Sequence, residues 1–171
     1  MTGTMAHDRG ETAPSAFERT VRGIALLGGV LLITLSATVV TSVTLRSDLV
    51  GSAGVPGDFE LVQMATAMAA FCFLPWCQLR RGNIFVDTFT LKLPERWRRR
   101  IDAAWDIVYA LVMALIAWRL AVGARAAFGT GETSMVLLVP TYLPIGLCAG
   151  LAMLVSVTAV VSARRLLRTA P

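Results

Sequence analysis

Four long apolar stretches, separated by short polar segments, dominate the pattern of this chain. Uncharged residues run through positions 23–45, 61–79, 107–118 and 133–163. An α-helix rises 1.5 Å per residue, so about 20 residues cross a hydrocarbon core of about 30 Å. We therefore predict four membrane-spanning helices, at residues 23–45, 60–79, 103–125 and 142–164.

The third stretch is the least regular of the four, because its uncharged centre is short. Apolar residues nevertheless continue to position 122, and Arg119 sits near one end, where its long stem can snorkel. Upstream, Trp97, Ile101, Trp105 and Val108 follow a helical period. Pro94 suits the first turn of a helix, so we predict that this helix begins near Pro94.

Prolines modify the second and fourth stretches. Pro75 lies one turn from the end of the second stretch, where we expect a mild kink. Pro140 and Pro144 lie near the start of the fourth. We expect this stretch to open as irregular or re-entrant chain and to become helical from about Tyr142 or Pro144.

The polar segments complete the organisation. Residues 1–20 are predicted to form a cytoplasmic tail, and residues 21–168 a four-helix membrane domain. The first span has one rival interpretation as a cleavable signal peptide. The apolar region of a signal peptide is only 7–15 residues long, shorter than this span.

Between the second and third spans, positions 82, 86, 89 and 93 share one helical face within the most basic segment, 80–102. This pattern is typical of an amphipathic segment lying in the membrane interface.

Composition supports an all-α integral membrane protein. Of the 171 residues, 56% are hydrophobic and 16% are charged. Ordinary soluble domains are about 45–50% apolar and about 25% charged. A soluble core of this size cannot bury so much apolar surface, and disorder requires low hydrophobicity. These comparisons exclude both classes.

Charge predicts the topology. The net charge is +5, from 16 Lys and Arg against 11 Asp and Glu. Thirteen of the 16 basic residues lie in the amino-terminal tail, the 80–102 segment and the carboxy-terminal tail. Cytoplasmic segments of membrane proteins are enriched in Lys and Arg. We therefore predict that both termini are cytoplasmic, and we attribute the basic excess to topology and not to a nucleic-acid partner.

The sequence contains few residues of the kinds that form catalytic or metal-binding sites. Ionisable residues at mid-depth mark membrane enzymes and pumps, yet none is visible at mid-depth in the first, second or fourth span, and Asp106 lies about one turn inside the inner end of the third. His7 is the single histidine, and the three cysteines fall in apolar runs without metal or disulfide spacing. We predict no catalytic residue, no metal site and no cofactor in this chain.

Two motifs carry a family resemblance. Residues 80–87 read Arg-Arg-Gly-Asn-Ile-Phe-Val-Asp and are followed by Leu93-Pro94, while residues 134–146 place Ser, an apolar run, Pro, Tyr, Pro and Gly in order. Over about residues 20–168 the chain resembles the small permease subunit (DctQ-like) of tripartite ATP-independent periplasmic (TRAP) transporters. The sequence departs from the family pattern at Asn83, where histidine is common.

The resemblance implies a division of labour in the bacterial inner membrane. Such systems join a large multi-helix permease, a periplasmic solute-binding protein and a small four-helix subunit. Sodium-driven uptake of organic acids is expected, with the ion and substrate sites in the large subunit. The small subunit is expected to be a non-catalytic scaffold that helps to dock the binding protein.

Eight residues are candidates for contact with these partners or with membrane lipids. For the basic loop, attraction to anionic lipid is the alternative to contact with the permease. For Arg119 and Arg125, the alternative is snorkelling to the membrane surface or a pair with Glu132. For Gly146 and Gly150, the alternative is packing of the fourth span against its own bundle. For Asp87, the alternative is a solvated carboxylate. The candidates are Arg80, Arg81, Asn83, Asp87, Arg119, Arg125, Gly146 and Gly150.

One alternative function stays open at this point. A self-assembling small transporter or channel would line its pore with the Ser and Thr residues of the first span, with Gln63 and Thr66 nearby. A membrane enzyme is a weaker third option, because the required carboxylate, histidine and cysteine arrangements are absent from the sequence.

Overall fold

Four helices account for most of the chain. The computed structural model describes residues 16–47, 54–80 and 95–168. Its helices are α1 (Ala16–Arg46), α2 (Asp58–Leu79), α3 (Glu95–Thr130) and α4 (Tyr142–Arg168). All four are long and apolar enough to cross a membrane, which confirms the predicted all-α membrane class. The predicted interfacial segment falls mainly on residues 81–94, outside the described residues.

Helix boundaries follow local signals in the sequence. The first described residue of α3 is Glu95, directly after Pro94, and α4 begins at Tyr142. At its other end α3 runs to Thr130, five residues beyond the predicted span. The helix stops there because Gly131 adopts a positive φ of 65°, the left-handed conformation common just after a helix. Pro75 lies inside α2 without ending it.

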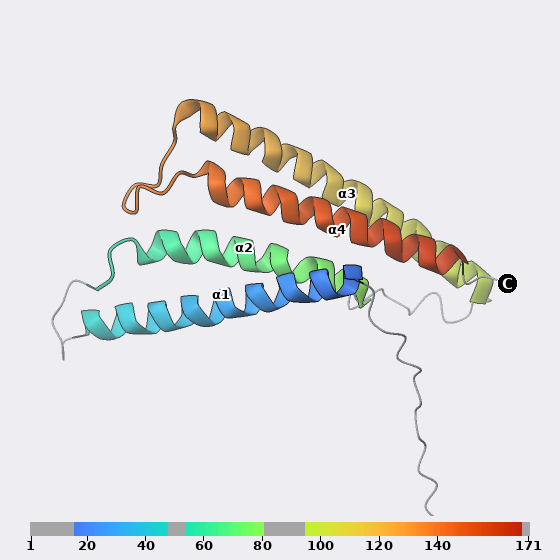
Figure 1. Cartoon of the computed structure of the whole chain (residues 1–171), viewed down its shortest axis with the longest axis horizontal. Helices are drawn as coiled ribbons and strands as arrows, with labels where there is room; N and C mark the ends of the chain where they lie inside the picture. Colours follow the sequence, from blue (N-terminus) through green and yellow to red (C-terminus); the bar gives the residue numbers. More distant parts are fainter. Residues whose placement is uncertain (1–15, 48–53, 81–94, 169–171) are drawn as a thin grey trace, which may run out of the picture.

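The helices form an open layer and not a closed bundle. Their backbones pack closely in three pairs, α1 with α2, α2 with α4, and α4 with α3. Within the ranges that the structure describes, no other helix pair packs closely. Figure 1 shows the resulting order, with α2 and α4 in the middle and α1 and α3 at the edges. Each edge helix therefore packs its backbone along one neighbour, and many of its large apolar side chains stay exposed.

The two ends of this layer differ in composition. The basic end holds the start of α1, the end of α2, the start of α3 and the end of α4, with Arg80, Arg164 and Arg165. The hairpin end holds the α1–α2 connection and residues 131–141, which join α3 to α4.

Small residues hold α3 against α4. On α3, Ala103, Ala110 and Ala117 are buried at intervals of seven residues, and the Ser156 hydroxyl of α4 donates a 2.8 Å hydrogen bond to the Ala110 carbonyl. Lipid removes the hydrophobic driving force between helices, so close backbone approach and such hydrogen bonds hold membrane helices together. This pattern explains why α4, which packs on two sides, is the most buried of the four helices.

The α1–α2 contact depends on one glycine. A Cβ atom built at Gly28 would lie 2.7 Å from the Cβ of Cys72 and 3.5 Å from the Ala69 carbonyl oxygen. Atoms of real side chains do not approach so closely, so α1 lies against α2 only because position 28 lacks a side chain.

Replacing Gly28 by alanine is expected to lower the free energy of unfolding by about 1 kcal/mol, the lower range of overpacking costs. Gly29→Ala is the matched control, because a Cβ there meets nothing within 4 Å. Both variants gain the same helix propensity, so their difference isolates packing. Unfolding of the purified subunit in mixed micelles measures it, and equal stabilities would contradict this account of the contact.

Candidate functional site

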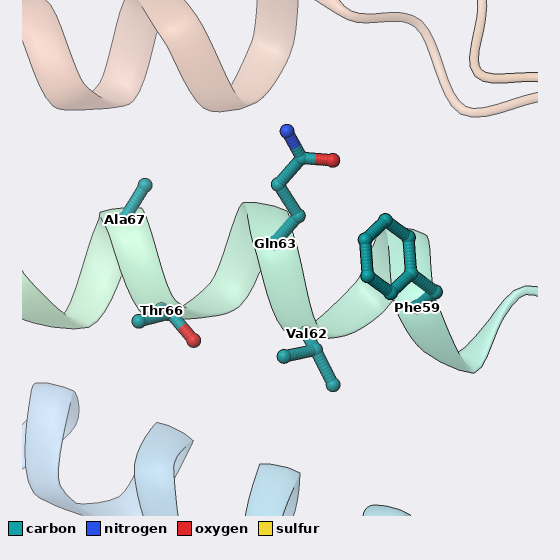
Figure 2. A pocket seen from close by; sticks show the side chains of 5 residues that line it. All are labelled: Phe59, Val62, Gln63, Thr66 and Ala67. Atoms are coloured by element: carbon teal, nitrogen blue, oxygen red, sulfur yellow. The ribbon is translucent and has the colours of Figure 1, made fainter.

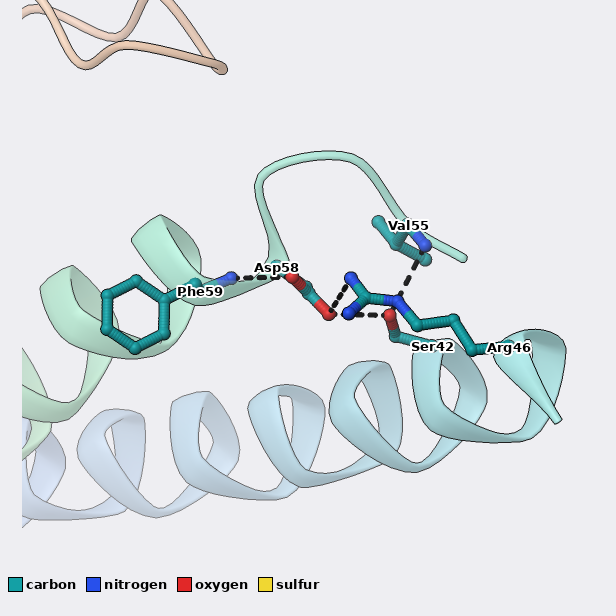
Figure 3. Close-up of polar contacts among 5 residues, drawn as sticks. All are labelled: Ser42, Arg46, Val55, Asp58 and Phe59. Atoms are coloured by element: carbon teal, nitrogen blue, oxygen red, sulfur yellow. Dashed lines mark hydrogen bonds and ion pairs between the residues drawn. The ribbon is translucent and has the colours of Figure 1, made fainter. Parts of the chain in front are cut away.

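A polar cluster joins α1 to α2 at the hairpin end (Figure 3). Asp58 Oδ2 accepts a 2.6 Å hydrogen bond from the Ser42 hydroxyl and forms a 2.9 Å ion pair with Arg46. The other oxygen of this carboxylate accepts the backbone N–H of Phe59 at 2.8 Å. Ser42 is fully buried and also accepts the Val55 N–H at 3.2 Å. The cluster fixes the last turn of α1 on the first turn of α2.

Residues 131–141 form a short hairpin between α3 and α4. Thr133 and Pro140 pair in an antiparallel bridge, and the Ser134 N–H donates to the Val139 carbonyl at 2.9 Å. The turn places Leu138 at a φ of 53°, an unusual conformation for a residue other than glycine. The hairpin is therefore an ordered structure with a defined tip at residues 135–138.

Glu60 of α2 binds this tip. Its carboxylate accepts the backbone N–H groups of Met135, Val136 and Leu137 at 2.9, 3.1 and 3.1 Å. Successive N–H groups that converge in a turn form a concave anion-binding site, and here the anion is a side chain of the same chain. The contact ties the α1–α2 pair to the α3–α4 pair at the hairpin end.

The outer surface of the hairpin tip is apolar and uncovered. Met135 is 93% exposed, and Val136 and Leu138 are exposed as well. Leu137 instead packs toward Gly57, whose missing side chain makes room for it. The tip therefore has one face bound to α2 and one face available to a membrane surface or a protein.

A second tie joins the helix pairs at the basic end. Gln78 of α2 donates a 2.8 Å hydrogen bond from Nε2 to Asp106 Oδ1 of α3. Both side chains are only 2% exposed. Nearby, Arg165 of α4 and Glu18 of α1 form a 3.3 Å ion pair. Polar contacts therefore connect the two helix pairs at both ends of the layer.

The Gln78–Asp106 contact was not among the predicted site residues. A signal for it exists in the sequence, because Asp106 falls between Ala103 and Ala110 on the same helical face as Ala117. This spacing of three and four residues places the carboxylate among the small residues that face other helices.

Only part of the predicted basic interface can be located. Arg80 ends α2, is exposed, and places its guanidinium 4.8 Å from the centre of the Trp76 ring. Arg81, Asn83 and Asp87 lie outside the described residues. The predicted interface role of these four residues stays a prediction.

Arg119 and Arg125 both lie exposed on α3. No hydrogen bond or ion pair joins either of them to another residue in the described ranges. The predicted alternative of a pair with Glu132 is therefore not formed between these described residues. Arg119 lines a 610 Å³ groove with four apolar side chains, Leu111, Ala114, Leu115 and Trp118.

Gly146 and Gly150 behave differently from one another. A Cβ at Gly146 would make ordinary contact with the Ala124 Cβ at 3.9 Å, whereas a Cβ at Gly150 would meet nothing within 4 Å. Both glycines line a 650 Å³ groove between α3 and α4. Packing within the layer thus accounts for Gly146 and leaves Gly150 facing an open groove.

A further groove of 540 Å³ follows the first half of α2, lined by Phe59, Val62, Gln63, Thr66 and Ala67. Figure 2 shows the Gln63 side chain extending from α2 on the side away from α1.

The threonines of α1, which the channel alternative requires to line a pore, donate hydrogen bonds to carbonyls of their own helix. Thr34 donates to Val30, and Thr38 donates to Thr34. Across residues 16–47, 54–80 and 95–168, no group of three or more His, Cys, Asp or Glu residues is placed to hold a metal ion.

Comparisons with known proteins give one positive result. No curated protein and no solved structure matches the chain. A family model described as "Tripartite ATP-independent periplasmic transporters, DctQ component" matches residues 35–169. This match covers most of the chain, including the last 12 residues of α1 and all of α2, α3 and α4. The chain therefore belongs to the DctQ family, the small membrane subunit of TRAP transporters.

Proposed function

We propose that this chain is a non-catalytic scaffold for the large permease of a TRAP transporter and helps to dock a periplasmic solute-binding protein. In this proposal transport is driven by sodium and the cargo is an organic acid. The family match over residues 35–169 carries the proposal. Sodium and cargo sites are assigned to the large permease, and no cofactor is assigned to this chain.

The open layer supports a scaffolding role. Its polar contacts, those of Asp58, Glu60 and Asp106 among them, connect helices and the α3–α4 hairpin of this chain to one another. Its edge helices α1 and α3 leave broad apolar surfaces uncovered. A layer that is internally tied and externally apolar suits lateral contact with other membrane helices.

The proposed setting is the bacterial inner membrane, with both termini in the cytoplasm. The basic end would then be cytoplasmic, as the distribution of Lys and Arg favours. The hairpin end would face the periplasm, and the exposed tip residues Met135 and Leu138 would be accessible to a docked binding protein.

Co-expression with the large permease and the solute-binding protein of the same system tests the proposal. We expect the chain to co-purify with the permease. We further expect proteoliposomes to need this chain, the permease and the binding protein together for sodium-dependent uptake. Absence of a complex with the permease would contradict the scaffold. Solute flux into liposomes that contain this chain alone would instead favour a small self-assembling transporter or channel.

A further inference from the structure

Arg119 occupies an unusual place for a charged residue. It lies 11 residues before the end of α3 at Thr130, which is about 16 Å along the helix axis. Gly146 of α4 lies beside Ala124, and Ser156 bonds to Ala110, so Arg119 is level with α4 near Gly150. That level is well inside the uncharged stretch 133–163. Arg119 therefore lies in the part of α3 that crosses the hydrocarbon core.

The surroundings of Arg119 are apolar and face outward. Leu111, Leu115 and Trp118 of the same groove are strongly exposed, with Trp118 at 72%. An unpaired arginine facing lipid at this depth is unfavourable, and Arg119 has no hydrogen bond or ion pair to a described residue. A negatively charged group from outside this chain would remove the penalty.

Two anions have the required chemistry, a lipid phosphate at the membrane surface and a carboxylate on another membrane helix. The geometry of the helix distinguishes them. Each Cα–Cβ bond in an α-helix tilts toward the amino terminus, so the side chain of Arg119 starts toward Glu95 and away from the nearer end at Thr130. To reach a lipid phosphate at the nearer surface, the Arg119 side chain would have to turn back against this direction. To reach a carboxylate at its own depth, the side chain does not have to turn back.

The neighbouring surface is shaped for a helix. The groove beside Arg119 and the 650 Å³ groove between α3 and α4 share Ala114 and Trp118. The second groove is lined mostly by alanine and glycine, including Ala117, Ala121 and Gly150. Small residues let helix backbones approach closely in a membrane, and Gly150 faces open space.

We propose that this α3–α4 face docks a transmembrane helix of the large permease that carries an aspartate or glutamate, and that this carboxylate pairs with Arg119 within the membrane. The inference rests on the proposed scaffolding function and names the surface that performs it. The partner helix would lie in the small-residue groove, with Trp118 between the groove and the ion pair.

Three substitutions in the small subunit test this face, each with the co-purified large permease as the readout. We expect Arg119→Leu and Gly150→Leu each to lower the recovered permease by about tenfold, the change that 1.4 kcal/mol produces, and Arg119→Glu to lower it further. The matched control for the first is Arg125→Leu, since Arg125 is exposed on the same helix but lines neither groove. The control for Gly150→Leu is Gly29→Leu, because both positions face open space.

Folding is checked on the isolated subunit. Arg119→Leu removes a charge from a lipid-facing surface, so its free energy of unfolding is expected to match or exceed that of the unsubstituted chain. Loss of the complex with a stable subunit therefore reports on docking. Combining Arg119→Glu with an arginine in place of the partner carboxylate is expected to restore recovery.

The outcomes separate the two proposals. If the unsubstituted chain recovers no permease, the proposed function fails. If it recovers the permease and the Arg119 and Gly150 variants do so equally well, the scaffold stands and the α3–α4 docking face is wrong. If Arg119→Leu instead loses bound anionic phospholipid in native mass spectrometry while recovery of the permease is unchanged, the occupant is lipid and the inference is overturned.

Discussion

Replacing Gly57 by alanine is expected to lower the free energy of unfolding by about 3 kcal/mol, for two reasons that add. Gly57 precedes α2 at a φ of 75°, where a side chain is strained. A Cβ there would also lie 2.7 Å from Leu137 Cγ. The clash pushes the hairpin tip off α2, so the three N–H groups that bind Glu60 are displaced as well.

Gly131→Ala is the matched control for this effect. Gly131 also has a positive φ, of 65°, but its added Cβ meets nothing within 4 Å. It is expected to cost about 1 kcal/mol, the strain of the left-handed conformation alone. Unfolding of the purified subunit in mixed micelles measures both variants. A Gly57→Ala variant no less stable than Gly131→Ala would show that the Leu137 contact contributes nothing.

Substituting Asp106 by leucine has the second-largest expected effect. It leaves the buried Gln78 Nε2 without the acceptor that lies 2.8 Å away. A buried donor deprived of its partner costs about 2 kcal/mol. The loss is expected as a lower free energy of unfolding and as a weaker connection between the two helix pairs, measured by steric trapping or by disulfide cross-linking between α2 and α3.

Two comparisons isolate the Gln78–Asp106 bond. The double variant Gln78→Leu with Asp106→Leu removes both partners of this bond and is expected to be more stable than the single variant, because the Gln78 donor is no longer buried without its acceptor. Asp102→Leu changes a carboxylate one turn earlier in α3 that is less buried, and a small effect is expected. If the single Asp106→Leu variant is as stable as the double variant, this hydrogen bond does not hold the pairs together.

The helices were predictable because lipid imposes a simple rule on sequence. A helix must be apolar for the whole width of the hydrocarbon, so the uncharged stretches locate α1, α2, α3 and α4. Local chemistry adds the boundaries, since Pro94 precedes the start of α3 and Tyr142 begins α4. At the carboxyl end, α3 continues five residues past the predicted span to Thr130, and Gly131 ends the helix.

The order of the helices was not predictable in the same way. Apolar residues that face lipid and those that face a neighbouring helix are alike in hydropathy, because no hydrophobic difference drives the helices together. The layer order instead depends on small residues such as Gly28 and Ala110 and on buried polar contacts.

The Glu60 contact was beyond sequence reasoning for another reason. It joins residues about 75 positions apart through backbone N–H groups, which every residue other than proline carries. Only the fold of the hairpin, with Leu138 at a positive φ, brings three of them to one carboxylate. Among the predicted candidates, Arg119 and Gly150 share one surface, and this surface depends on the α3–α4 packing.

The two contacts between the helix pairs, at Glu60 and at Gln78, also bear on mechanical behaviour. They are 18 residues apart on α2, which is about 27 Å along its axis and nearly a full membrane width. Sliding one pair past the other by a single turn, about 5.4 Å, would break both contacts at once. The layer therefore resists shear along its helix axes, and its two halves keep one fixed register.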